Sequence, residues 1–174
     1  ALVFAACTPP SAPVVGPIDV RPAAYDPAQD SLRFPEETHL RNVRQLTFGG
    51  NNAEAYWSFD DKQLIFQSDW GRINAQGCDQ QFVMNADGSV LDPAPPAPDA
   101  EHAARDARYR LVSTGRGRTT CGYFLPTGEL LYGSTHAGGT ACPASPPTPG
   151  RYVWHIYETY DIYVANGDGS NPRP

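Results

Sequence analysis

Short apolar runs separated by polar turn residues recur twice along the chain, and this repeat dominates its pattern. Residues 44–47 and 55–68 match residues 110–113 and 121–134 at a constant offset of 66, which takes 44 to 110 and 68 to 134. In each copy an aromatic-rich segment, a tight turn and an apolar run follow one another without helical spacing. We therefore expect each copy to fold as short antiparallel strands.

A third segment repeats farther along the chain, at a different spacing. Residues 82–89 match residues 163–170 at an offset of 81, and both end in Asn-x-Asp-Gly-Ser, a hairpin turn signal. Since 81 exceeds 66 by 15, the second copy carries 15 extra residues between its second and third strands. The Pro-rich stretch 143–149 lies within this insertion.

The apolar runs at residues 64–66 and 130–132 are continuous rather than alternating. Such runs are typical of strands that are buried on both faces. Three or four short antiparallel strands in each copy, with no helix between them, describe the blade of a β-propeller. The predicted fold class is all-β, with two antiparallel blades of three to four strands. They would form an incomplete propeller, because closed rings need roughly 4–8 blades.

Composition and charge narrow the function classes. The 174 residues include 18 Pro and 16 Gly, which leaves little room for long helices. The formal net charge is −6, and there is no run of Lys or Arg. Nucleic acid is therefore not an expected partner, because binding to phosphates needs a concentrated basic surface.

The N-terminal residues resemble the end of a bacterial lipoprotein signal peptide. Residues 1–7 are apolar, then small, and end in Cys7, the residue that would receive a diacylglycerol. Residues 8–38 are rich in Pro and Ala, and we expect them to be a tether between the lipid and the folded part. This predicts an exported protein held at a membrane surface by its acyl chains. The alternative is a chance apolar stub that ends in a free cysteine.

The repeat divides the folded part into two blades. We expect residues 39–113 to form the first blade together with the strand that leads to the second. Residues 114–174 would form the second blade, which we expect to be truncated. The segment that follows the first blade, residues 110–113, has no counterpart after the second, so the chain is expected to be a fragment.

Three cysteines lie in the folded part. Blade topology places Cys78, Cys121 and Cys142 at one rim, and three cysteines in an exported protein allow one disulfide and one free thiol. We favour a Cys121–Cys142 disulfide, which would pin the insertion, over Cys78–Cys142. A metal site of His136 with Cys121 and Cys142 is a weaker alternative, because C-x-x-C and H-x-x-x-H spacings are missing.

The chain lacks the sequence patterns of common enzymes. It contains no G-x-S-x-G, no H-E-x-x-H and no G-x-x-x-x-G-K pattern. Its Asp residues at turn positions are better explained by capping of the backbone than by acid–base chemistry. We therefore expect no catalytic residue and no cofactor.

Two basic and three ring-bearing side chains form a candidate binding rim, made of Arg116, Arg118, His136, Trp154 and Tyr157. Arg116 and Arg118 would face the central channel of a propeller, where they either bind a carboxylate or are simply solvated. The aromatic residues between 152 and 163 either pack a strand or line a surface that binds peptide or sugar.

The segments 46–47, 56–68 and 82–88 together resemble the WD-like repeat of the TolB propeller family. In that family a W-S-P-D-G-K turn joins the inner two strands, and I-x-x-M-x-x-D-G marks the third. The turn at residues 57–62 has Phe in place of Pro and Asp in place of Gly. The second copy, at residues 123–128, keeps the Pro and the Gly but lacks the Trp.

A longer stretch, residues 113–124 followed by Ser134-Thr135-His136 and Cys142-Pro143, also looks like a subset of bacterial lipoproteins labelled as Tol-type biopolymer-transport proteins. The resemblance implies a non-catalytic scaffold in the periplasm or at the outer membrane that binds an envelope protein or polymer. One alternative is the N-terminal propeller of a larger exported peptidase. Another is a propeller that binds or cleaves glycans.

Overall fold

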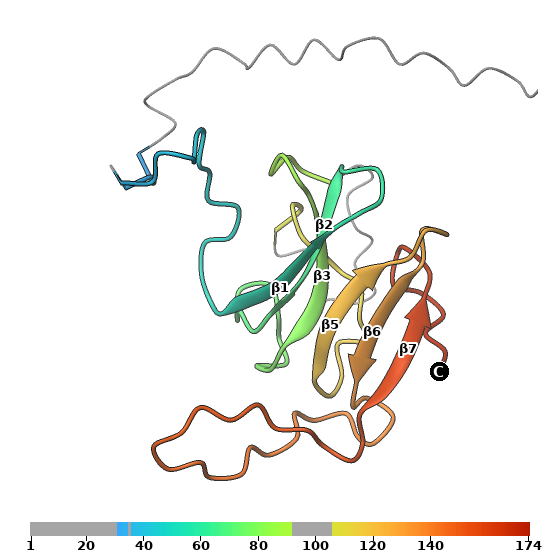
Figure 1. Ribbon diagram of the computed structural model, residues 1–174. Helices are drawn as coiled ribbons and strands as arrows, with labels where there is room; N and C mark the ends of the chain where they lie inside the picture. Colours follow the sequence, from blue (N-terminus) through green and yellow to red (C-terminus); the bar gives the residue numbers. More distant parts are fainter. Residues whose placement is uncertain (1–30, 35, 92–105) are drawn as a thin grey trace, which may run out of the picture. The chain divides into compact units, whose positions relative to one another are not determined.

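A computed structural model describes residues 31–34, 36–91 and 106–174 (Figure 1). The chain divides into two compact units, residues 1–45 and 46–174, and all strands of the described part lie in the second unit. That part contains strands but no helix, which confirms the all-β prediction. Cys7, the predicted signal-peptide end and most of the predicted tether lie outside the described residues.

The strands form two antiparallel sheets in which neighbours along the chain are neighbours in space. The first sheet has the order β1-β2-β3-β4, and the second has the order β5-β6-β7. The strands of the first sheet are β1 (Asn52–Trp57), β2 (Gln63–Ser68), β3 (Gln80–Asn85) and β4 (Arg110–Leu111). Those of the second sheet are β5 (Thr119–Phe124), β6 (Leu130–Ser134) and β7 (Asp161–Ala165).

The first strands of the two sheets share a local irregularity. The register of β1 with β2 shifts between Ala53 and Tyr56, and that of β5 with β6 shifts between Thr120 and Tyr123. A non-glycine residue with positive φ lies at each shift, Glu54 at 53° and Cys121 at 51°. Glu54 and Cys121 are 67 residues apart, and so are the residues that bound the two shifts. Two sheets that share such an unusual backbone feature are copies of one unit.

The structure corrects the constant offset expected from the sequence. Tyr56 of β1 opposes Ile65, and Tyr123 of β5 opposes Leu131. Equivalent residues of the two first strands, such as Tyr56 and Tyr123, are therefore 67 residues apart. The second strands keep the offset of 66, which takes Ile65 to Leu131. The turn in the second sheet is therefore one residue shorter than the turn in the first.

The third strands end in the same turn. Ser89 N–H donates to Asp87 Oδ1 and Ser170 N–H donates to Asp168 Oδ1, both at 2.9 Å. Beyond this turn a further segment pairs with the third strand in the same register. In the first sheet Arg110 of β4 pairs with Val83 of β3, and in the second Arg173 pairs with Val164 of β7 as an isolated bridge.

The segment that precedes each sheet also repeats its packing. A Cβ atom built on Gly88 would lie 3.2 Å from the Leu46 side chain, and one built on Gly169 would lie 2.6 Å from the Val112 backbone. Leu46 and Val112 are 66 residues apart and hold equivalent places. Residues 44–47, however, form no strand, so the strand expected there is wrong, whereas its counterpart begins with β4.

The main core lies between the sheets. Ile65 and Val83 on one face of the first sheet pack with Val112 and Leu130, and all four are buried. β5 lies against β1 and β2 (Figure 1). A Cβ atom on Gly122 in β5 would lie 2.3 Å from Gln81 Oε1, so the lack of a side chain lets β5 approach the first sheet closely.

The opposite face of the first sheet is also buried. Phe66, Phe82, Met84 and Tyr109 form a second cluster there, so the apolar run 64–66 is buried on both faces as predicted.

The second sheet is buried on one face only. Leu130 and Tyr132 are buried, but Leu131 between them is half-buried, and Ile162 on the neighbouring strand is 65% exposed. The prediction of two buried faces is therefore wrong for the run 130–132. Each sheet has the other on one face. The second face of the first sheet is covered by side chains of its connecting segments, Leu46, Trp70, Ile73 and Tyr109, and the described residues place no such cover over Leu131 and Ile162.

Candidate binding rim

Most of the candidate residues lie at one edge of the two sheets, the edge formed by the ends of the strands. At this edge β2 and β6 end, and β3, β5 and β7 begin. Thr119 N–H donates to Asp79 O at 2.9 Å, and Thr120 Oγ1 donates to Gln67 Oε1 at 3.1 Å, so the edges of the two sheets are joined directly. We call this edge the disulfide edge, after the bond that crosses it.

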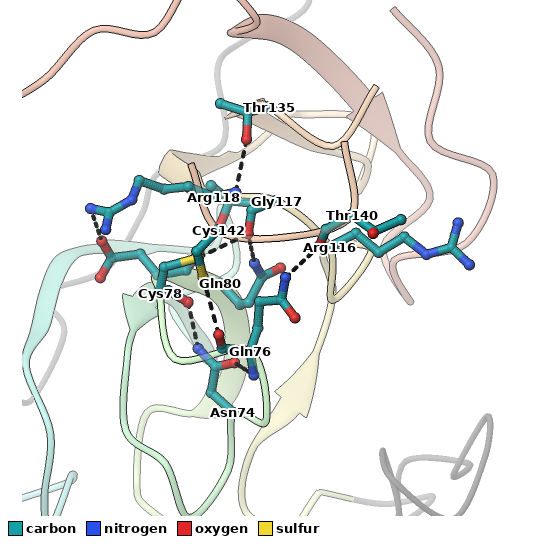
Figure 2. Close-up of a disulfide and its surroundings, with 12 residues drawn as sticks. Asn74, Gln76, Cys78, Gln80, Arg116, Gly117, Arg118, Thr135, Thr140 and Cys142 are labelled. Atoms are coloured by element: carbon teal, nitrogen blue, oxygen red, sulfur yellow. Dashed lines mark hydrogen bonds and ion pairs between the residues drawn. A yellow bond between two sulfur atoms is a disulfide. The ribbon is translucent and has the colours of Figure 1, made fainter. Parts of the chain in front are cut away.

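The disulfide joins Cys78 and Cys142, whose Cα atoms are 6.0 Å apart (Figure 2). This corrects the favoured Cys121–Cys142 pairing and agrees with the alternative. The physical reason is that Cys121 lies in the register shift of β5, beside Gln67 Oε1, and its thiol is exposed and free. The insertion instead crosses the start of β3, where Gln76 donates to the carbonyl oxygen of Thr140.

Gly117 is the structural centre of this edge. Its N–H donates to Thr140 O at 3.0 Å, and its carbonyl accepts from Gln80 Nε2 at 2.8 Å. A Cβ atom here would lie 2.6 Å from Thr135 Oγ1, and φ is +59°, so a side chain would be both strained and obstructed. The Arg116 and Arg118 side chains therefore leave a fixed backbone, and they point in opposite directions from it (Figure 2).

Arg118 binds a carboxylate of its own chain. Its Nη1 lies 3.2 Å from Asp79 Oδ2, and both side chains are largely buried. Burial raises the pKa of Asp79, and the charge of Arg118 opposes that rise. Asp79, which the sequence reading did not single out, thus occupies the place expected for a ligand carboxylate at Arg118.

Tyr160 lies beside this ion pair. Burial raises its pKa to about 12, and the charges of Arg118 and Asp79 act on it in opposite directions. Its hydroxyl is buried and has no hydrogen-bond partner among the described residues. The Arg118–Asp79 pair and Tyr160 therefore form a polar group beneath the surface of the disulfide edge rather than an open channel lining.

Arg116 and His136 lie at the surface of the disulfide edge, in contrast to the Arg118–Asp79 pair and Tyr160 beneath it. Arg116 is exposed, whereas the His136 ring packs 4.2 Å from the Tyr163 ring. His136 Nδ1 lies 2.8 Å from Ser134 Oγ. Burial and the positive charge of Arg116 lower the pKa of His136, so its ring is neutral at pH 7. The structure thus brings a cationic and a neutral hydrogen-bonding side chain together.

The aromatic residues after the insertion divide between core and surface. Tyr163 is buried against Tyr132, and Tyr157 packs on Tyr160 at 5.9 Å between ring centroids. Trp154 is 45% exposed and Tyr152 is 89% exposed. The packing interpretation is therefore confirmed for Tyr163, while binding of peptide or sugar by the exposed Tyr152 and Trp154 stays a prediction.

The described residues contain no group of three or more His, Cys, Asp or Glu side chains placed to hold a metal ion. His136 with Cys121 and Cys142 is therefore not a metal site in this part of the chain, since Cys142 is in the disulfide. No helix within the described ranges is long and apolar enough to cross a bilayer.

No family model matches the chain, and neither the curated proteins nor the solved structures compared with it give a match.

Proposed function

We propose that the two sheets are blades of a TolB-like β-propeller, and that the chain belongs to an exported lipoprotein acting as a non-catalytic binding scaffold in the bacterial envelope. In this proposal Cys7 carries the lipid, which holds the protein at the periplasmic side of a membrane or at the outer membrane. The partner is an envelope protein or polymer.

One observation carries the propeller proposal: each sheet packs on the segment that precedes it in the same way. Leu46 meets Gly88 and Val112 meets Gly169, while Arg110 and Arg173 pair with equivalent residues of the third strands. Stacking of identical four-stranded units through such connecting segments is what a propeller requires. The exposed Ile162 face of the second sheet also fits a further neighbouring sheet.

Binding at the disulfide edge is supported by its rigidity and its mixed chemistry. The disulfide, the Gly117 contacts and the Arg118–Asp79 pair fix the backbone, and Arg116 and His136 remain reachable from solvent. A fixed edge that presents a guanidinium and an imidazole is suited to carboxylates and backbone carbonyls of a polymer partner.

Site-specific photo-crosslinking in the native envelope tests the proposal. A benzoylphenylalanine placed at Arg116 is expected to capture a defined partner, whereas one at Thr127, on the opposite edge of the same sheet, is not. A third probe at His136 is expected to lose most of its adduct when Arg116→Glu is introduced. Equal capture at Arg116 and Thr127, or no capture from cells that retain the folded protein, would contradict a binding role for this edge.

A further inference from the structure

The insertion of the second sheet ends in a segment with an unusual surface. Residues 151–157 have no regular secondary structure, and residues 151–154 and 156 are exposed. Tyr152 and Ile156 are 89% and 87% exposed, and Trp154 between them is 45% exposed, whereas His155 and Tyr157 are half-buried. We call residues 150–157 the apolar loop. It presents four large apolar side chains to solvent, those of Tyr152, Val153, Trp154 and Ile156, which soluble proteins rarely do without a binding purpose.

The base of the apolar loop is fixed. The Cys78–Cys142 disulfide holds the chain before it, and after it a Cβ atom on Gly138 would lie 2.5 Å from Thr159 Cβ. Four prolines lie between the disulfide and the loop: Pro143, Pro146, Pro147 and Pro149. Proline restricts the backbone, so the apolar side chains are presented from a stiffened segment that extends away from the sheets (Figure 1).

The charge around the apolar loop differs from that of the rest of the chain. The protein has 19 Asp and Glu residues, yet residues 130–157 contain none. Arg151 lies directly before Tyr152, and His155 lies within the loop. The loop itself carries Arg151 and no carboxylate, and Glu158 is the first carboxylate after it. An arginine beside exposed aromatic residues is complementary to an anionic surface.

We propose that the apolar loop inserts into an anionic phospholipid surface. Tyr and Trp favour the interface between headgroups and acyl chains because their rings are apolar and carry one polar group. Tyr152, Trp154 and Ile156 enter this layer, while Arg151 pairs with headgroup phosphates. This contact needs neither a lipid on Cys7 nor a partner at the disulfide edge, so it goes beyond the proposed scaffold function.

Vesicle co-sedimentation tests this inference with the full chain carrying Cys7→Ser, which leaves no acceptor for an acyl chain. The chain is expected to bind vesicles of equal parts phosphatidylcholine and phosphatidylglycerol, and to bind phosphatidylcholine vesicles weakly. The double variant Tyr152→Ser, Ile156→Ser is expected to lose at least about tenfold in affinity, because its main apolar contacts are removed. Arg151→Gln is expected to lose about fivefold on anionic vesicles only.

Phe59→Ser is the matched control. Phe59 is similarly exposed, but it lies in the turn between β1 and β2, at the opposite edge of the sheets, so its replacement is expected to leave binding unchanged. Circular dichroism of each variant checks that the sheets remain folded.

A fluorescence measurement on the unsubstituted chain tests the same inference if a variant is poorly folded. Brominated phospholipids in the vesicles are expected to quench the tryptophan fluorescence of the unsubstituted chain. In Trp154→Phe most of this quenching is expected to disappear, although Trp57 and Trp70 remain. Vesicle binding that survives the double variant, or quenching that survives Trp154→Phe, overturns the proposal. So does self-association through Tyr152 and Ile156 without vesicle binding, because the loop would then contact a second copy.

Discussion

The two sheets have one backbone design but different surroundings. Their first strands share a register shift with a positive-φ residue, and their third strands end in the same Asp-Gly-Ser turn. The first sheet buries Ile65 on one face and Phe66 on the other, whereas the second leaves Leu131 half-buried. The comparison teaches that local turn and strand signals determine the backbone, while neighbouring elements determine which faces become core.

The loops that join the second and third strands also differ. In the first sheet the loop is short, and Asn74 closes it by donating to Ser68 O at 2.8 Å and to Cys78 O at 2.7 Å. In the second sheet the corresponding loop is long, and the disulfide fastens it to the first sheet. The second loop therefore depends on a covalent bond where the first relies on one side-chain amide.

The largest expected effect tests this dependence. We expect Cys142→Ser to lower the free energy of unfolding by about 3 kcal/mol, because the disulfide closes a long loop of chain. Cys121→Ser is the matched control and is expected to change it by less than about 0.5 kcal/mol, since this cysteine is exposed and forms no disulfide. Guanidinium unfolding measures both. Equal effects, or a thiol titration that finds Cys78 free in the unsubstituted chain, would refute the pairing.

A second substitution pair tests the difference in burial. Ile65 and Leu131 hold equivalent places in β2 and β6, but Ile65 is fully buried between the sheets. We expect Ile65→Ala to cost about 3 kcal/mol of unfolding free energy and Leu131→Ala about 1 kcal/mol, because only the first leaves a closed cavity. Thermal and guanidinium unfolding give both values. If the two costs are the same, the faces are equally buried in solution and the comparison fails.

The smallest expected loss of stability tests the turn that ends the third strand of both sheets. Asp87 and Asp168 each accept the backbone N–H two residues later at 2.9 Å. We expect Asp87→Ala and Asp168→Ala each to cost about 1 kcal/mol, because each removes one exposed turn hydrogen bond. Unfolding curves recorded side by side measure the pair. Costs that differ by more than about 1 kcal/mol would show that the two turns are not equivalent.

The sequence predicted the strands well where turn chemistry is local. The Asn-x-Asp-Gly-Ser turns and the apolar runs at 64–66 and 130–132 lie in or beside β2, β3, β6 and β7. The one-residue difference between the first turns was missed, although the aromatic pairs offered a signal. Tyr56 and Trp57 match Tyr123 and Phe124 at an offset of 67, whereas the apolar runs of the second strands match at 66.

The candidate site was only partly predictable. The sequence brought Cys78, Cys121 and Cys142 to one edge, and it identified Arg116, Arg118 and His136. It did not pair the cysteines correctly, because that choice depends on where a long insertion crosses the sheets. No motif predicts the roles of Asp79 and Tyr160, because these roles follow from burial beside Arg118.

The Cys78–Cys142 bond has a mechanical consequence for the folded chain. The two cysteines are separated by 64 positions in the sequence, and the chain between them includes β3 to β6. Tension applied to the chain ends passes through the sulfur–sulfur bond and not through that segment. About 200 Å of extended chain is therefore shielded from stretching until the bond is reduced. Among the described strands, β1, β2 and β7 lie outside this closed loop and can be released under load while the bond is intact.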